Sequence, residues 1–518
     1  MERDFNMWLS LRMNQSVNHD FPIRRFCPAR IEQEIVLDDN ELCTFDATTT
    51  SCLLASSELD DFVDSFINMD QYEDNEVNEK NHHQSFDHFM VNEEENIDAY
   101  SMEVNDVIGY VPTTMEICDN ITIADLVIQK CVPCEERISF QMDQGLDLVH
   151  TLLACAEAVG CRDNHQANLL LSKILSLANP SGDSLQRVTY FFAKGLKCRL
   201  SLYPYNAFSN SASNDVCLIT RENKLEAFQL LYQTTPYITF GFMAANEAIC
   251  QASKGESSIH IIDLGMEHTF QWPSLIRNLA SMPDGPPKLR ITGFGSSDVK
   301  LDTGMSLLVA EAISLGIVLE FRIIFEPATP SSLTIENLKL VEGESLVFNS
   351  ILKLHKYVKE SRGYLKEILQ SMKKLNPIAV TVVEQDTNHN GPFFVGRFLE
   401  SLHYYSAVFD SLEASMARSS RIRMKIERAH FAEEICNVVG YEGPDRMERH
   451  GRVDQWRRQL GRAGFHVMPL KCTSQARTVL SVYDCDGYTL SCEKGCLLLG
   501  WKGRSIMMAS AWQVASLS

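Results

Sequence analysis

Apolar residues recur at every third or fourth position from about residue 144 onward, a spacing typical of amphipathic helices. The clearest stripe comprises Leu148, Leu152 and Val159 on an alanine-rich segment that ends at Gly160. Similar stripes predict helices over 167–175, 188–202, 224–232 and 237–252. Residues 143–255 are therefore predicted to form a mainly helical cap. Such a stripe favours core packing, and a partner interface that includes Leu148, Leu152 and Val159 is the alternative, which can coexist with it.

The pattern changes at Ser257 to strands and helices in alternation. Strands are predicted over 259–263, 289–293, 318–324, 345–349 and 378–384, with helices over 270–280, 304–315 and 357–375 between them. Alternation of this kind predicts parallel βαβ units with helices on both faces of one sheet. Long helices are then expected over 393–412, 421–439 and 446–463, and an antiparallel terminal set over 478–483, 487–490 and 497–501. The predicted fold class is α/β, with a Rossmann-like, methyltransferase-like core sheet over residues 256–515.

The N-terminal region differs sharply in charge from the rest of the 518-residue chain. Residues 31–120 contain 24 Asp or Glu and one Lys, whereas the net charge of the whole chain is -21. So acidic a stretch buries too little apolar surface to offset its ordering entropy, so residues 1–142 are predicted to be mostly disordered. Within them, residues 59–67 interleave apolar side chains with acids, which is typical of activation segments, and a solvated linker is the alternative.

The net charge and the cysteines indicate which cellular compartment and which kind of binding partner to expect. A strongly acidic chain does not approach DNA by bulk charge. The 16 cysteines form no framework, and Glu2, Arg3 and Asp4 precede any apolar run, so we expect no secretory leader and reduced thiols in the nucleus or cytosol. Cys131 and Cys134 form one CxxC pair without a second pair at ligand spacing, which argues against a structural zinc site. The sequence offers no run of about 20 apolar residues that would span a membrane.

The residues at the end of the predicted strand 259–263 and just after it are the most informative part of the chain. Asp263 and Gly265 lie where a parallel strand reaches the ligand-facing edge of its sheet. A nucleoside site would continue as a glycine-rich loop, but this chain continues with Met266, Glu267 and His268. We therefore predict no cofactor. Asp263 could be a general base or a ribose ligand, and capping of the following helix or hydrogen bonding to loop amides is favoured.

Catalytic candidates beyond this strand are weak. Gly293-Phe294-Gly295 follows a predicted strand but contains only two glycines, which is little evidence for a nucleotide. His260, His355 and His403 lie on unrelated elements, without a serine elbow or an HExxH spacing to recruit them. The chain is therefore predicted not to be an enzyme.

A basic stretch between Arg418 and Arg462 holds eleven cations and seven acids. This modest excess could contact DNA phosphates. The candidates for such contacts are Arg421, Arg423, Lys425, Arg457 and Arg458. Solvated helix faces with internal ion pairs are the favoured alternative.

Several motifs together resemble the GRAS family of plant transcriptional regulators. The VHIID motif of that family is matched with isoleucine in place of its first valine, and leucine-rich regions lie at about 146–203 and 305–338. The motif residues are Ile259, His260, Ile261, Ile262 and Asp263 of the VHIID motif, Arg397, Glu400, Tyr404 and Tyr405 of a PFYRE-like region, and Trp456, Trp501 and Trp512 of the SAW region. Trp501 and Trp512 are expected to pack in the core. The motifs follow the family order over about residues 143–513.

The resemblance implies a nuclear transcriptional regulator that acts mainly through protein contacts. Its implied partners are other GRAS proteins, as homo- or heterodimers, and DNA-binding transcription factors, with DNA reached directly or through them and with no membrane. The tail lacks the sequence for which the DELLA branch is named, and residues 263–268 and 285–287 look most like the branch named for arbuscule development. Two alternatives remain, an S-adenosylmethionine-dependent methyltransferase of Rossmann-like fold and a direct, sequence-selective DNA binder.

Overall fold

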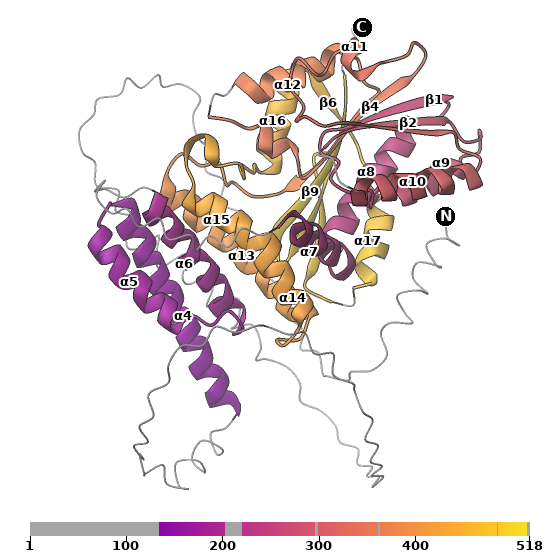
Figure 1. Ribbon diagram of the computed structural model, residues 1–518. Coiled ribbons are helices and arrows are strands. Elements are labelled where there is room, and N and C mark those ends of the chain that lie inside the picture. Colours follow the sequence, from indigo (N-terminus) through magenta and orange to yellow (C-terminus); the bar gives the residue numbers. More distant parts are fainter. Residues whose placement is uncertain (1–133, 203–219, 296–298, 361–362, 484, 515–518) are drawn as a thin grey trace, which may run out of the picture. The chain divides into compact units, whose positions relative to one another are not determined.

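The computed structural model describes residues 134–202, 220–295, 299–360, 363–483 and 485–514 (Figure 1). Residues 1–133 of the region predicted to be disordered lie outside these ranges, whereas residues 134–142 form the start of helix α4 (Cys134–Gly160). Across them, no helix has the length and apolar character needed to cross a membrane.

A single mixed sheet forms the centre of the domain (Figure 1). Its strands are β1 (Ser258–Asp263), β2 (Lys288–Phe294), β3 (Leu319–Ile324), β4 (Ser345–Ile351), β5 (Ala379–Gln385), β6 (Phe465–Met468), β7 (Tyr488–Glu493), β8 (Cys496–Trp501) and β9 (Arg504–Val514). The order is β3-β2-β1-β4-β5-β9-β8-β7, and β6 pairs with the far end of β9. Strands β1 to β5 are parallel and β9 is antiparallel to β5, which confirms the predicted Rossmann-like core.

Helices cover both faces of the sheet because its central strands are apolar on both sides. On one face, α8 (Pro236–Ala252), α9 (Trp272–Ala280) and α10 (Val299–Ser314) pack on Ile259 and Ile261. On the other, the short α11 (Ile335–Leu338), α12 (Gly363–Lys374) and α16 (Val453–Ala463) pack on Ile262 and Phe348. Helix α17 (Thr473–Ser481) contacts α8.

A second group of helices lies beside the sheet and forms the cap. It contains α4 (Cys134–Gly160), α5 (Asn164–Leu177), α6 (Ser184–Leu202), α7 (Arg221–Thr234), α13 (Phe394–Ser415), α14 (Arg421–Ile426), a π-helical turn η2 (Glu427–Phe431) and α15 (Ala432–Gly440). Helix α6 packs on α13 and α15, and α7 packs on α14 and η2. The cap therefore combines segments from both halves of the domain.

These contacts group the helices differently from the predicted division at residue 255. Helix α8 was assigned to the helical cap, yet it packs on β4, β5 and β9, because most of its surface is apolar and its residues are buried on nearly every side. Helices α13 and α15 were assigned to the core, yet they pack on α6. The outer limits of the domain, 143–515, stay a prediction.

One predicted element is wrong, and two predicted helices begin later than expected, the one over 357–375 only at Gly363. Residues 478–483 were expected to form a strand, but α17 continues to Ser481. The helix predicted over 446–463 begins only at Val453, and residues 446–452 lack regular structure. The predicted helix over 421–439 is continuous but passes through the π-turn η2.

Charged side chains tie α6 to the later cap helices. The Arg187 side chain is fully buried, and its Nε donates to both carboxylate oxygens of Glu427 at 3.0 and 3.1 Å. Its Nη1 donates to Glu413 Oε2 at 2.5 Å and to the Gly182 carbonyl at 2.7 Å. Arg423, also buried, lies 3.6 Å from Glu427 Oε1. Because these side chains are buried, removing one of them would leave an unpaired charge in the interior and lower the stability of the cap.

Candidate functional site

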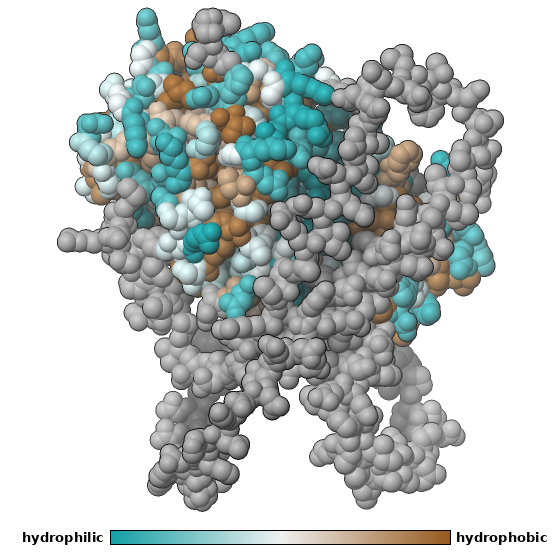
Figure 2. All heavy atoms as spheres, turned by 180° about the vertical axis from the view of Figure 1, so that it is seen from behind, coloured by the Kyte–Doolittle hydropathy of each residue, from teal (hydrophilic) through white to brown (hydrophobic). Residues whose placement is uncertain are grey.

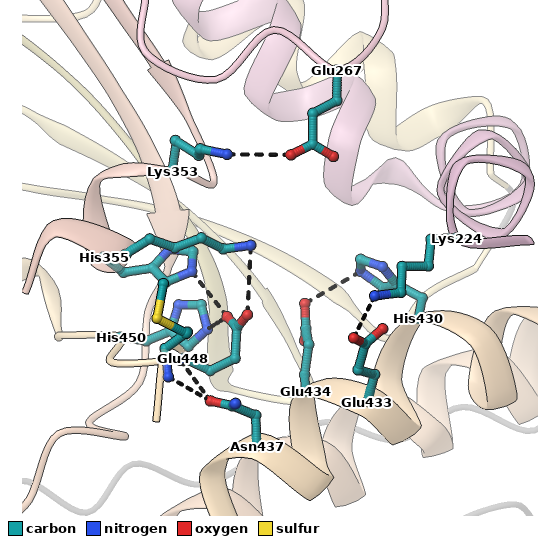
Figure 3. A network of polar contacts seen from close by, with 12 residues as sticks. Lys224, Glu267, Lys353, His355, His430, Glu433, Glu434, Asn437, Glu448 and His450 are labelled. Atoms are coloured by element: carbon teal, nitrogen blue, oxygen red, sulfur yellow. Dashed lines mark hydrogen bonds and ion pairs between the residues drawn. The ribbon is translucent and has the colours of Figure 1, made fainter. Parts of the chain in front are cut away.

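A cavity of about 630 Å³ opens at the carboxyl ends of β1, β4 and β5. The residues that follow these strands form one wall, including Met266, Lys353 and Gln385. Helix α7 and the segment from η2 to α15 supply the other wall, including Lys224 and Glu434 (Figure 3). The ligand site of a Rossmann-like sheet lies at this edge, so the cavity is the first candidate for a functional site.

Asp263, at the end of β1, fastens the loop that follows it. Its Oδ1 accepts a hydrogen bond from the Gly265 amide at 2.8 Å, and its Oδ2 accepts one from Asn349 Nδ2 at 2.7 Å. Asn349 also donates to Gln271 Oε1 at 2.9 Å and accepts from Thr381 Oγ1 at 2.7 Å. Burial raises the pKa of Asp263 to about 6. Hydrogen bonding to a loop amide, one of the two favoured roles, is confirmed, whereas capping of the following helix is not, because Gln271 is the N-cap residue of α9.

Met266 fills the space over the end of β2. Its side chain is buried, and its amide donates to the Phe294 carbonyl at 2.8 Å. A Cβ atom on Gly293 would lie 2.6 Å from the Met266 Cβ, and one on Gly295 would collide with the Met266 carbonyl oxygen. These two glycines therefore make room for the chain's own loop, and their spacing has an explanation without a nucleotide.

His268 joins the same loop to helix α7 through stacked rings. Its ring is stacked between Phe228, 4.6 Å away between centroids, and Phe270, 4.7 Å away. Phe270 is stacked in turn with Tyr232 at 5.9 Å. Burial lowers the pKa of His268 to about 4, although Glu267 nearby favours the charged form. The loop that carries Met266 and His268, at the position of a glycine-rich cofactor loop, is thus held by stacking on Phe228 of α7 and on its own Phe270.

The stacking of His268 predicts a pH dependence of stability. Its folded-state pKa, about 4, lies below the ordinary value of 6.5, so the unfolded chain binds the proton first. The contribution of the neutral ring is complete above pH 6.5 and is lost as the pH falls toward 4. The variant His268→Phe keeps a flat ring in the stack, so we expect its unfolding free energy to fall less over this range.

Urea unfolding of both chains at several pH values between 4 and 7 measures the difference. His260 and His403, whose pKa values burial lowers to about 3 and 4, titrate with the same sign in both chains and cancel in the comparison. An identical pH profile for the two chains would contradict the assignment.

Cations on the cavity rim are matched with acids (Figure 3). Lys353 Nζ lies 3.2 Å from Glu267 Oε1, and Lys224 Nζ lies 2.5 Å from Glu433 Oε1. This pairing leaves little free positive charge on these lysines for a phosphate-bearing ligand.

A buried group of histidines and glutamates lies at the inner end of the cavity. His355 Nδ1 is 2.7 Å from Glu384 Oε2, and His355 Nε2 is 2.9 Å from Glu448 Oε2. Burial opposes ionisation of Glu384, but His355 and His450 hold its pKa at about 2. Burial likewise opposes protonation of His450, but its contacts with Glu384 and Glu448 raise its pKa to about 9. Sequence reasoning missed this group because its members come from three separate parts of the chain.

The predicted interface residues of α4 face inward. Leu148, Leu152 and Val159 are buried, with 6, 0 and 8% of their surface exposed. Their stripe packs within the cap, which supports the favoured core role, and an additional contact with a partner at these positions stays a prediction. The exposed leucines nearby are Leu169 and Leu177 of α5, which are 56 and 58% exposed.

The candidate phosphate contacts do not form one basic surface. Arg423 is fully buried, Lys425 pairs with Glu226, and Arg457 lies 3.4 Å from Asp454. Only Arg421 and Arg458 of the five candidates are exposed. Helix α14 packs on α7, whereas α16 packs on α12 and β6, so the two groups lie on different layers. Arg423 is therefore excluded as a surface contact, and internal ion pairs explain most of the basic stretch.

Most family-motif residues serve the fold. His260 Nε2 lies 2.8 Å from Thr292 Oγ1 inside the sheet. Arg397 Nε donates to the Val438 carbonyl at 3.3 Å, and Glu400 Oε1 accepts from Arg504 at 2.7 Å. The hydroxyl of Tyr404 donates to the Ile506 carbonyl at 3.2 Å, and that of Tyr405 donates to Glu434 at 3.0 Å. Trp501 and Trp512 are at most 2% exposed, which confirms their predicted core role, and Trp456 is buried as well.

Comparison with known proteins agrees with the motifs. The GRAS domain family matches residues 148–513. The GRAS family protein RAD1 of Lotus japonicus is 47% identical over 380 residues, covering 71% of this chain and 74% of that protein, and RAD1 of Medicago truncatula is 45% identical over 392 residues, covering 73 and 75%. The DELLA protein GAI1 of Vitis vinifera is 38% identical over 385 residues, covering 72 and 63%.

A solved structure shows the same fold. The crystal structure of SCL7 in Oryza sativa has 30% sequence identity and a TM-score of 0.63, covering 71% of this chain and 99% of that one. The greater similarity to RAD1 than to a DELLA protein agrees with the branch that the sequence details indicated. The chain belongs to the GRAS domain family of plant transcriptional regulators.

Proposed function

We propose that this protein is a nuclear transcriptional regulator that acts mainly through contacts with other proteins, its Rossmann-like core serving as a scaffold. Family membership supports the regulatory role. The observation that carries the scaffold role is that Met266 fills the space over the carboxyl end of β2, above Gly293 and Gly295, where a cofactor-binding fold has its glycine-rich loop. The partners are other GRAS proteins, in homo- or heterodimers, and DNA-binding transcription factors.

Exposed apolar side chains around strand β3 support docking of proteins. Among the residues that the structure describes, β3 pairs with β2 alone, which leaves one strand edge open. Large apolar side chains that are more than half exposed lie on α10, on α11 and in the segments next to β3 and after α11, namely Leu307, Ile313, Val318, Phe325, Ile335 and Val341. On the face seen in Figure 2, apolar residues are scattered among polar ones. Side chains of this kind favour protein contacts over solvent when they gather near an open edge.

Direct, sequence-selective DNA binding is the weaker candidate. It relies on the arginine-bearing helices, in which Arg423 is buried and Lys425 and Arg457 are paired. We therefore propose that the chain reaches DNA chiefly through its partners.

A binding measurement distinguishes the scaffold role from the remaining alternative, a methyltransferase. Titration of S-adenosylmethionine into the full chain in a calorimeter is expected to produce no binding heat, because Met266 and the stacked His268 occupy the loop position that such a ligand needs. Stoichiometric binding at micromolar affinity would contradict the scaffold role and favour the methyltransferase.

A further inference from the structure

Four buried side chains meet beside the cavity and take no part in the proposed function. His355 lies in η1 (Leu354–Tyr357) after β4, Glu384 lies near the end of β5, and Glu448 and His450 lie in the irregular segment before α16. Asn437 Oδ1 of α15 accepts from the amides of Met447 and Glu448 at 2.7 and 2.9 Å and so positions this segment (Figure 3). The four side chains are at most 13% exposed.

The hydrogen bonds fix which atoms face one another. Because carboxylate oxygens only accept, His355 Nδ1 donates to Glu384 Oε2 at 2.7 Å. In the neutral ring the other nitrogen, Nε2, then carries a lone pair, and it faces Glu448 Oε2 at 2.9 Å. His450 Nε2 lies 3.2 Å from the same oxygen. Nitrogen and carboxylate lone pairs at these separations repel unless a cation, a proton or a metal ion, lies among them.

The ring of His450 is buried without hydrogen-bond partners among the described residues, which is a second observation beside the facing lone pairs. Its side chain is fully buried, yet neither ring nitrogen makes a hydrogen bond of acceptable geometry to any part of the chain that the structure describes. Buried ring nitrogens normally have such a partner. Its Nδ1 is 3.8 Å from Glu384 Oε2, so the same carboxylate lies behind both imidazole rings.

We propose that His355 Nε2, His450 Nε2 and a Glu448 carboxylate oxygen bind one zinc ion, with Glu384 orienting the rings. The ligand atoms of the three residues lie within 4.8 Å of one another. Two imidazoles and one carboxylate form a known zinc ligand set, whereas magnesium and calcium prefer oxygen ligands alone. A carboxylate behind a metal-binding histidine is the usual orienting partner.

The remaining surroundings fit this arrangement. Glu448 Oε1, the oxygen turned away from the rings, lies 3.6 Å from Lys356 Nζ, which leaves Oε2 for the ion. His355 and Glu448 also line the cavity, so the fourth coordination position faces an open space from which the ion can enter. Bound zinc would fasten the segment that carries Glu448 and His450 to the carboxyl edge of the sheet, a role that does not depend on the proposed function.

Zinc titration of the full chain, stripped of metal by a chelator, tests the site. The chain should carry Cys131→Ser and Cys134→Ser so that this cysteine pair cannot compete. We expect calorimetry to give one zinc ion per chain, and Glu448→Gln to weaken binding at least about tenfold because it removes a charged ligand. His165→Gln, on an exposed residue of α5, is the matched control and should leave the affinity unchanged.

Two further measurements distinguish a metal site from a buried ion-pair network. Glu384→Gln leaves all three ligands in place and is expected to weaken zinc binding about 10–100-fold. Cobalt bound to the chain that carries Cys131→Ser and Cys134→Ser, with all four cluster residues unchanged, should give visible ligand-field bands without a thiolate charge-transfer band. Absence of stoichiometric zinc binding, an affinity indifferent to Glu448→Gln in a chain shown to be folded by circular dichroism, or a thiolate band would each overturn the proposal.

Discussion

Replacement of Arg187 by alanine is expected to lower the free energy of unfolding by about 3–5 kcal/mol, because it leaves Glu427 buried without the guanidinium that donates a bifurcated hydrogen bond to it. Glu427 is only 1% exposed, so water cannot take the place of the guanidinium. Arg423, 3.6 Å away, remains and places the expected loss toward the lower end of this range. Urea unfolding at pH 7 measures the change.

The matched control is Arg277→Ala in α9. Arg277 Nη2 lies 2.7 Å from Glu311, but the two side chains are 46 and 28% exposed. Solvent screening limits such a pair to under about 1 kcal/mol. Equal losses for Arg187→Ala and Arg277→Ala would show that the buried network does not hold the cap together.

Leu152→Ala is expected to lower the free energy of unfolding by about 2–5 kcal/mol, because the Leu152 side chain is fully buried in the cap. Affinity for a GRAS partner, expressed per folded molecule, should stay unchanged. Leu169→Ala on the exposed side of α5 should behave in the opposite way, with a stability change within about 0.5 kcal/mol and weaker partner binding.

Analytical ultracentrifugation of the full chain, alone and with a second GRAS protein, supplies the affinities for comparison with urea unfolding. If Leu152→Ala weakened association beyond its loss of folded protein, α4 would contribute to the interface after all. If Leu169→Ala left association unchanged, the docking surface would have to lie elsewhere, with the surroundings of β3 as the next candidate.

The local pattern of apolar residues was sufficient to predict the parallel strands of the sheet. Residues 259–263 alternate into a short apolar run that ends in the acid Asp263, and β1 is buried along all of these positions. The same reasoning failed at 478–483, where Ala476 and Val479 are buried at helical spacing while the short run beyond them looked like a strand. Short apolar runs do not separate strand from helix without their tertiary neighbours.

Tertiary contacts also explain why the grouping of helices and the histidine cluster escaped prediction. Arg446 and Arg449 fall within the predicted helix 446–463, but they are buried and donate to the carbonyl oxygens of His389 and Gly443, at 2.9 and 2.7 Å, in a segment without regular structure. His355 and Glu448 meet across 93 residues of sequence. No local spacing indicates such a pair. In contrast, the absence of a glycine-rich loop after Asp263 is evident from the sequence, and the structure explains it by the packing of Met266.

The most direct test of the central claim is the expression of a reporter gene in plant nuclei when the full chain is fused to a DNA-binding domain that recognises the reporter promoter. We expect a reproducible change in expression relative to the DNA-binding domain alone. Deletion of residues 1–142 should remove most of this change while the thermal transition of the remaining domain stays nearly the same. Reporter expression that the nuclear, full-length fusion leaves unaltered would contradict the proposal that this protein regulates transcription.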